Sequence, residues 1–243
     1  DFAAKLPGLI LFRHILPVPV VDLPQLFADI DSYSFGPVEE RAAAFGRVQE
    51  YLELFLKGRQ NEAPKGDLVD VILAGVKRDG STCPWEDKVH TALDVVFGGL
   101  ATTTHAMSGA MYEMARRPSV RAAVVSDPAR MHTAVEETVR LYAPVVMAAR
   151  TVRNDVEING MKIAAGERVA LNFAAASRDP DVCSNPREFD VERAEVVHTA
   201  FGIGPHRLHC GRPRPCARHL LCALCGVEPR QKRARLFCED SQS

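Results

Sequence analysis

Residues 96–104 read VFGGLATTT, and the interpretation of the surrounding chain depends on this stretch. It lies within a run from about Pro84 to Arg117 that we predict to be one long helix, since proline is favoured at a first helical position. Gly98 and Gly99 stand in the middle of that run, where each costs roughly 1 kcal/mol relative to alanine. Two adjacent residues that weaken a helix imply either the close approach of a ligand or a local distortion.

Thr102 follows the two glycines by one turn of the predicted helix. A threonine hydroxyl at such a place can bond to a backbone carbonyl of its own helix, or to a ligand held in the gap. The residue pattern leaves both interpretations open.

Further helices are expected on both sides of this stretch. On the N-terminal side, the apolar residues from Val38 to Gln60 follow a helical period, and Asp67 is placed to cap a short apolar helix. On the C-terminal side, residues 119–128 and 129–144 read as two more helices, each stopped near a proline.

After Pro144 the hydrophobic period changes from that of a helix to that of a strand. Asn159-Gly160 is the strongest short signal for a β-hairpin turn. The expected strands and the irregular connection after them are, in order, residues 145–152, 155–163, 164–177 and 178–193. The fold class is therefore expected to be mainly α with a small β-sheet.

The composition argues against several functional classes. The chain has 243 residues, 47% of them hydrophobic and 25% charged, which is ordinary for a globular protein. A net charge of −1 gives no sign of a nucleic-acid partner or of an anionic membrane surface. The apolar runs are too short to span a bilayer, and no signal peptide is visible at the start. The first 207 residues contain only Cys83 and Cys183, which fits a reducing cytoplasm.

Two further patterns carry chemistry only in combination with the rest. Glu137 and Arg140 are three residues apart on a predicted helix, so they share a face and can pair. Such a pair contributes only a few tenths of a kcal/mol when it lies on a surface. Residues 201–206, FGIGPH, form a glycine-rich loop whose backbone can approach a ligand closely.

Together, and in this order, these pieces resemble the cytochrome P-450 family of the soluble bacterial type, over roughly residues 1–207. FGGLATTT resembles the oxygen-binding helix of the family, and EETVR its Glu-x-x-Arg helix. Later segments resemble its hairpin, its meander and the start of its haem loop. The five matching segments are residues 97–104, 136–140, 150–169, 176–193 and 198–206.

The resemblance implies a cytochrome P-450 fold, truncated at its N-terminus, that encloses a haem (iron protoporphyrin IX) held by one cysteine thiolate. It implies a monooxygenase that inserts one oxygen atom of O2 into a small organic substrate, and residues 96–104 lean toward a terpenoid. Electrons would come from a ferredoxin-type donor and its reductase, with no nucleic-acid or membrane partner. The alternative is a catalytically inactive remnant that lacks a correctly placed thiolate.

The resemblance also assigns roles to individual residues. Some would contact the haem, others would fix the meander behind it, and others would face oxygen or substrate. Arg150 and the loop residues are expected at the haem, although Arg150 read alone is a solvated strand residue and His198 a loop histidine. The expected haem contacts are Arg150, His198, Phe201, Gly204 and His206. The network is Glu137, Arg140 and Arg193; Thr102 would face oxygen; Gly98, Val145 and Val146 would face substrate.

The sequence departs from the family pattern at three places. The family usually has an acid just before the threonine, where this chain has Ala101, which cannot relay a proton. The front of the family's chain has no counterpart in this sequence. The cysteine expected two residues after His206 is replaced by Leu208. Cys210 lies two residues further on, roughly 6–7 Å in an extended segment, so the loop would have to repack for Cys210 to bind the metal.

The composition changes abruptly at Leu208, and residues 208–243 form a tail rich in cysteine, arginine and proline. We therefore expect two parts, residues 1–207 from the family domain and residues 208–243 not natively folded. A one-base shift of the reading frame at Leu208 would restore a cysteine codon, so we hypothesise that the tail is an out-of-frame translation. A zinc cluster of Cys216, His219, Cys222 and Cys225 is a rival interpretation, but these spacings fit no standard module.

Overall fold

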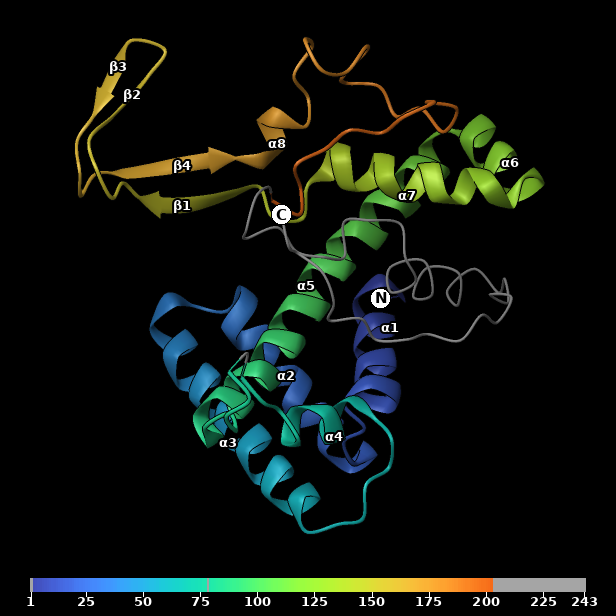
Figure 1. Ribbon diagram of the computed structural model, residues 1–243. Helices are drawn as coiled ribbons and strands as arrows, with labels where there is room; N and C mark the ends of the chain where they lie inside the picture. Colours follow the sequence, from blue (N-terminus) through green and yellow to red (C-terminus); the bar gives the residue numbers. More distant parts are fainter. Residues whose placement is uncertain (1, 78, 203–243) are drawn as a thin grey trace. The chain divides into compact units, whose positions relative to one another are not determined.

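A helix of 32 residues, α5 (Trp85–Arg116), organises the structure. Glu86 and Asp87 lie in its first turn, where negative charge is favourable. It ends at Arg116; the next residue, Arg117, has an extended backbone, because a residue that precedes a proline is disfavoured in a helix. The helix is continuous through Gly98 and Gly99, so the local distortion that the glycine pair raised as a possibility does not occur. Figure 1 shows α5 running between the other helices.

The computed structural model of the chain describes residues 2–77 and 79–202. Residues 1–200 belong to one compact unit, which is the part considered below. The predictions made for Gly204, His206, Leu208, Cys210 and the tail 208–243 lie outside the described residues. No helix within the described ranges has an apolar stretch long enough to cross a bilayer.

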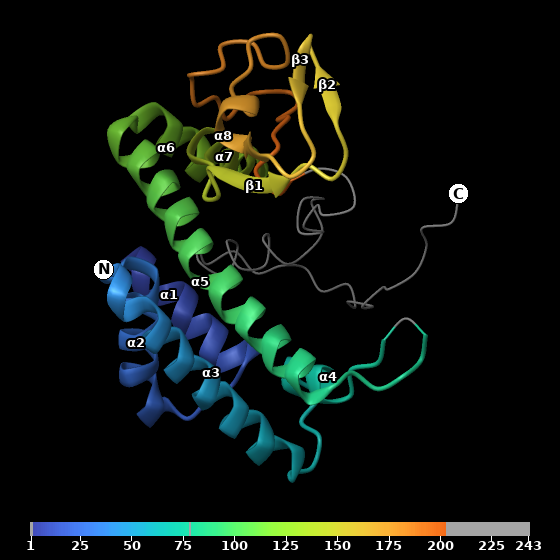
Figure 2. The ribbon, with the colours of Figure 1, turned by 90° about the vertical axis from the view of Figure 1, so that its left-hand side faces the viewer.

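The helices that precede α5 pack along its N-terminal half (Figure 2). Their buried aliphatic and aromatic side chains form one core with the buried face of α5, in which Phe12, Leu52 and Val96 are fully inaccessible to solvent. Asp67 caps the last of these helices by accepting a hydrogen bond from the backbone N of Asp70. The elements are α1 (Phe2–Ile10), the π-helical turn η1 (Leu11–Ile15), the 3₁₀ turn η2 (Val20–Asp22), α2 (Leu23–Phe35), α3 (Val38–Gln60) and α4 (Leu68–Leu73).

Two shorter helices, α6 (Pro118–Ser126) and α7 (Pro128–Tyr142), follow α5. Asp127 separates them and caps α7 by accepting a hydrogen bond from the backbone N of Ala129 at 2.9 Å. Both helices begin with a proline. A backbone N–H at the first helical position has no intrahelical acceptor, so proline, which lacks this group, loses no hydrogen bond there. A second core cluster joins these helices to the irregular C-terminal segment; its buried members are Val120, Val124, Ala134, Leu141, Phe189 and Val191.

The strands form two separate antiparallel pairs rather than one sheet. In the first pair Arg150 lies opposite Val169. The second pair is a hairpin closed by Asn159 and Gly160, which have φ values of 50° and 79° and so satisfy the turn predicted there. The pairs are β1 (Met147–Thr151) with β4 (Arg168–Asn172), and β2 (Val156–Ile158) with β3 (Met161–Ile163).

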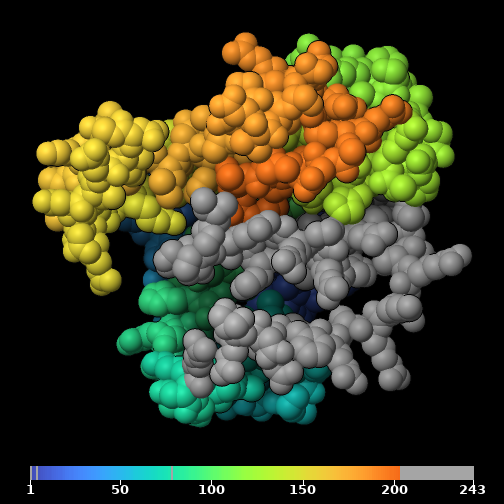
Figure 3. All heavy atoms as spheres, turned by 45° about the horizontal axis from the view of Figure 1, so that its top comes forward, coloured from blue at the N-terminus to red at the C-terminus, as the bar shows by residue number. Residues whose placement is uncertain are grey.

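A short helix, α8 (Phe173–Ala176), leads into an irregular segment, residues 177–200. Figure 3 shows this segment, in orange, lying against α6 and α7, in green. Phe189 and Val191 are buried there although they belong to no helix or strand. Because the segment has few backbone hydrogen bonds of its own, its course depends on side chains that reach it from α7 and from the end of α5.

Candidate functional site

The most buried polar group of the described chain is the pair Glu137 and Arg140 on α7. Both are 0% exposed, and the three-residue spacing brings them to one face. Arg140 Nε donates to Glu137 Oε1 at 2.6 Å, and Nη2 donates to Oε2 at 3.0 Å. This is a bidentate pair, the geometry in which an arginine and a carboxylate interact most strongly.

The remaining donors of Arg140 hold three backbone carbonyls of the irregular segment. They reach the oxygens of Ser177 at 3.3 Å, Pro186 at 2.7 Å and Glu188 at 2.8 Å. Burial acts to lower the pKa of the Arg140 guanidinium, but the hydrogen bonds and charge of Glu137 outweigh it and the pKa is raised. The guanidinium therefore stays charged while it fixes a segment that has no regular structure.

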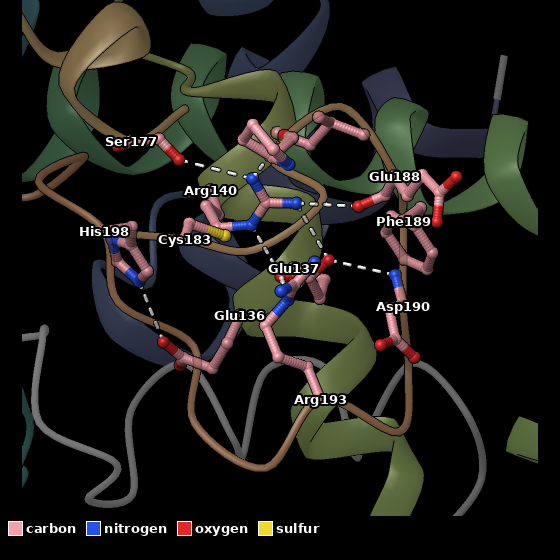
Figure 4. A network of polar contacts seen from close by, with 12 residues as sticks. Glu136, Glu137, Arg140, Ser177, Cys183, Glu188, Phe189, Asp190, Arg193 and His198 are labelled. Carbon is pink, nitrogen blue, oxygen red and sulfur yellow. Dashed lines mark hydrogen bonds and ion pairs between the residues drawn. The ribbon is translucent and has the colours of Figure 1, made fainter. Parts of the chain in front are cut away.

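Glu137 also binds the far end of the same segment (Figure 4). Its carboxylate accepts from Arg193 Nε at 3.0 Å and from the backbone N of Asp190 at 3.0 Å. Arg193 Nη1 donates to the carbonyl of Ser184 at 2.8 Å, which folds the segment back on itself. The structure thus brings together Glu137, Arg140 and Arg193, the three residues that the resemblance groups as one network.

A second buried carboxylate, Glu113 near the end of α5, was missed by sequence reasoning. It is 1% exposed and accepts from the hydroxyl of Tyr142 at 2.5 Å, and it pairs with Arg117 Nε at 3.1 Å. Arg117 Nη1 donates to the carbonyl of Phe189 at 3.0 Å. Burial and the neighbouring carboxylate raise the pKa of Tyr142 to about 12. The four-residue spacing of Glu113 and Arg117 was the one available signal, and it does not point to Tyr142.

On α5, the stretch that carries the predicted oxygen-facing residue presents an open surface. The hydroxyl of Thr102 donates to the carbonyl of Gly98 at 2.6 Å, which is the within-helix alternative stated for it. A Cβ atom added to Gly98 or Gly99 would meet no described atom within 4 Å outside the helix itself. Neither glycine is required by packing against a described neighbour, and among the described residues none occupies the space next to them.

Val145 and Val146, expected on the substrate side, lie just before β1, and Arg150, expected at a haem carboxylate, lies within it. Val145 and Val146 are 38% and 51% exposed. Arg150 is exposed, and its Nη1 donates to the neighbouring carbonyl of Ala149 at 2.9 Å. Within residues 2–77 and 79–202 no carboxylate pairs with this guanidinium. The guanidinium of Arg150 can therefore donate hydrogen bonds to a carboxylate of a group that is not part of the described chain.

His198 is placed differently from an exposed loop residue. Its side chain is 4% exposed, and Nε2 lies 2.9 Å from Glu136 Oε2 on α7. The backbone N of Ala200 donates to Nδ1 at 3.3 Å, so in the neutral ring Nε2 carries the proton and donates it to the carboxylate. Phe201, the next predicted haem contact along the chain, is half-buried.

The described residues fit a haem on two grounds, the open face of α5 at Gly98 and the carboxylate-free guanidinium of Arg150. His198 fits less directly, because Glu136 already holds it. The described part of the chain contains no group of three or more histidine, cysteine and acidic side chains placed to hold a metal ion. Both positions considered for the thiolate, and the residues of the zinc alternative, lie outside it.

Comparison with known proteins agrees with this geometry. The family model for cytochrome P450 matches residues 11–131 and 131–207. Cytochrome P450-terp of Pseudomonas sp is 37% identical over 159 residues, which are 65% of this chain and 36% of that protein. The linalool 8-monooxygenase of Pseudomonas putida is 31% identical over 169 residues, which are 69% of this chain and 41% of that protein.

A solved structure shares the fold. The cytochrome P450 PksS of the Bacillus subtilis 168 bacillaene polyketide synthase superimposes with a TM-score of 0.78 at 25% identity, over 85% of this chain and 54% of that one. The chain spans 36% to 54% of the length of the curated relatives it matches. The residues matched by the family model include α5, α7 and the irregular segment 177–200.

Proposed function

This chain belongs to the cytochrome P450 family, and we propose that it supplies the haem-facing part of a haem-thiolate monooxygenase. The observation that carries the proposal is the buried network in which Arg140 and Glu137 fix residues 177–193. That network buries two charges and uses them to hold an irregular segment, and we infer that the fixed position of this segment is what the network provides. The segment leads directly into the glycine-rich loop at residue 201.

Each residue has a proposed role toward the cofactor. Haem supplies the iron at which O2 is activated when it is bound. Arg150 would pair with a haem carboxylate, and His198, Phe201, Gly204 and His206 would line the approach of the loop. Thr102 would exchange its hydrogen bond with the Gly98 carbonyl for one to a ligand beside α5.

We propose a small apolar substrate of terpenoid type. The relative named for linalool 8-monooxygenation acts, by its name, on linalool, and P450-terp has the higher identity of the two. In this chain Gly98 leaves room beside α5, while Val145 and Val146 add apolar surface. Ferredoxin-type electron donation and a cytoplasmic site of action are proposed as well; the free thiols of Cys83 and Cys183 are compatible with a reducing compartment.

One observation favours a second candidate, a remnant that holds no thiolate-ligated haem. Leu208 occupies the position at which the family pattern has its cysteine, two residues after His206. We propose that residues 1–207 are the family domain and that residues 208–243 lie outside it.

The spectrum of the reduced protein with carbon monoxide separates the two candidates. We would compare the unaltered chain, Leu208→Cys and Cys210→Ala, each produced with added haem. A red-shifted band in the unaltered chain that is lost in Cys210→Ala supports the monooxygenase, with Cys210 as ligand. A band only in Leu208→Cys means that the pocket holds haem but the thiolate is missing. Absence of the band in all three would contradict the monooxygenase proposal.

A further inference from the structure

A small cavity of about 60 Å³ opens on one face of α5. The helix contributes Phe97, Leu100, Ala101 and Thr104, which are spaced as one helical face. Ala101 is the lining residue that directly precedes Thr102. Between Phe97 and Thr104 this helix carries no ionisable side chain. Any ionisable group that lines the cavity must therefore come from the helix on its other side.

The facing element is α2, whose Tyr33 ring lies with its centroid 4.5 Å from that of Phe97 on α5. It contributes Phe27, Ile30, Asp31 and Ser34, a face with the same spacing as that of α5. Asp31 is the one titratable residue among the lining residues, and it is also exposed to solvent. No described residue forms a side-chain hydrogen bond or ion pair with the carboxylate of Asp31.

The cavity has the size and the polar groups that ordered water needs. The hydroxyls of Ser34 and Thr104 make no side-chain hydrogen bond to any residue in the described ranges. With Asp31 they offer three polar partners, and a volume of about 60 Å³ has room for a few waters. Phe27, Ile30 and Leu100 provide apolar walls, which confine that water between solvent and the helix.

We propose that Asp31 and this cavity form the path by which protons pass from solvent to α5 beside Thr102. The inference rests on the proposed function: insertion of one oxygen atom of O2 reduces the other to water, which consumes two protons and two electrons per turnover. Because residues 97–104 of α5 carry no ionisable side chain, Asp31 is the relay residue. A carboxyl group that gives up a proton to cavity water is reprotonated from the solvent to which it is exposed.

The placement of Asp31 is tested by a thiol probe in the variant Ala101→Cys, which differs from alanine by one sulfur atom. The pKa of this thiol is measured from the pH dependence of its alkylation rate, resolved by mass spectrometry of its peptide. A carboxylate across the cavity disfavours the thiolate, so Asp31→Asn is expected to lower the thiol pKa by about 0.5 to 1 unit. Glu50→Gln, an exposed acid on α3, is the control and is expected to leave it unchanged.

His105, whose ring centroid lies 6.2 Å from that of the lining residue Phe35, is present in every variant compared, so its contribution is common to all the measurements. An equal thiol pKa with and without Asp31 overturns the proposal, and this measurement needs no haem. In any preparation that shows the carbon monoxide band, Asp31→Asn is expected to increase the share of electrons released as hydrogen peroxide. Adding Ala101→Asp to the Asp31→Asn variant is expected to lower peroxide release again. Unchanged peroxide release would also overturn the proposal, whereas absence of the band bears only on the proposed function.

Discussion

At the scale of single residues, the arginine of α7 is the most demanding choice in the chain. Arg140 is fully buried and uses all three of its nitrogens: Nε and Nη2 donate to Glu137, and Nη1 and Nη2 donate to backbone carbonyls. Its planar fork can serve a carboxylate and several carbonyls at once, which an ammonium group cannot do. The identity of this residue, and not only its charge, is therefore fixed by its contacts.

Arg140→Lys tests this requirement. The lysine ammonium cannot form the bidentate pair with Glu137, and carbonyls of the segment would lose their donors. We expect the free energy of unfolding to fall by about 3–5 kcal/mol, the usual cost of breaking a buried pair. Urea denaturation followed by circular dichroism measures it. Arg121→Lys, at an exposed position on α6 without an ion pair in the described chain, should change it by less than about 0.5 kcal/mol. Equal effects of the two variants would contradict the argument.

The raised pKa of Tyr142 makes a prediction for alkaline solution. Burial and Glu113 raise the pKa of Tyr142 to about 12 in the folded state, against an ordinary value near 10. The folded state therefore holds this proton more tightly, so the resulting stability is complete below about pH 10 and is lost as pH rises toward 12. Tyr142→Phe should remove that alkaline loss from the pH dependence of the urea midpoint.

The same variant is also read by tyrosinate absorbance. Tyr51 has its pKa raised as well, by burial and by Asp22, so it too should titrate late. In the unaltered chain two of the four tyrosines, Tyr51 and Tyr142, should titrate above the ordinary range. Tyr142→Phe should leave one, and an unchanged late component would contradict the assignment.

At the scale of secondary-structure elements, the crossing of α5 and α7 depends on a glycine. A Cβ atom at Gly109 would lie 2.9 Å from Cγ of Tyr142 and 3.2 Å from the Cγ2 methyl of Thr138. The side chain of Tyr142 is held in place by its hydrogen bond to Glu113, so it cannot move aside without cost. The close packing of the two helices therefore excludes any side chain at this position.

Gly109→Ala and Gly46→Ala form a matched pair of variants. Both glycines lie inside long helices, where alanine is intrinsically preferred by about 1 kcal/mol. At Gly46 an added Cβ meets no described atom within 4 Å, so Gly46→Ala should raise the free energy of unfolding by about 0.5–1 kcal/mol. At Gly109 overpacking should dominate and lower it by about 1–3 kcal/mol. Thermal and urea unfolding measure both, and a shared sign would refute the packing argument.

How far the elements could be predicted depends on whether their signals are local. The apolar period of Val38–Gln60 predicts α3 at the bounds it has, and the run predicted from about Pro84 to Arg117 matches α5 to within one residue at each end. The partners of Arg140 could not be predicted, because residues 177–188 have no period and contribute backbone rather than side-chain groups. For the hydroxyl of Thr102, the sequence left open a hydrogen bond to a carbonyl of its own helix or one to a ligand. The structure shows the first of these, to the carbonyl of Gly98.

At the scale of the whole molecule, residues 1–200 form one compact unit that contains both hydrophobic clusters. The clusters are joined by α5, whose first half belongs to one and whose end is linked to the other through Glu113 and Tyr142. Every stabilising contact described above lies within this unit. The proposed boundary at residue 207 follows from the change of composition at Leu208.

This boundary predicts the result of a deletion. If residues 208–243 contribute nothing to the folded domain, a chain ending at Arg207 should keep the urea midpoint and the denaturant dependence of the full chain. A chain ending at Val191 is the comparison, because it removes Arg193 and His198 from their partners on α7. It should lose several kcal/mol or fail to fold. A large loss on removing 208–243 alone would show that the tail belongs to the domain.

The contacts of Arg140 also fix when, during synthesis, the protein can mature. The guanidinium and Glu137 leave the ribosome before the carbonyls and the Arg193 side chain that cover them, which come 37 to 56 residues later in the chain. Until then a nascent α7 carries two uncovered charges on what must become its inner face. A message cut short before Arg193 thus yields a polypeptide whose defect is permanent, which makes it a substrate for proteases and not a smaller working protein.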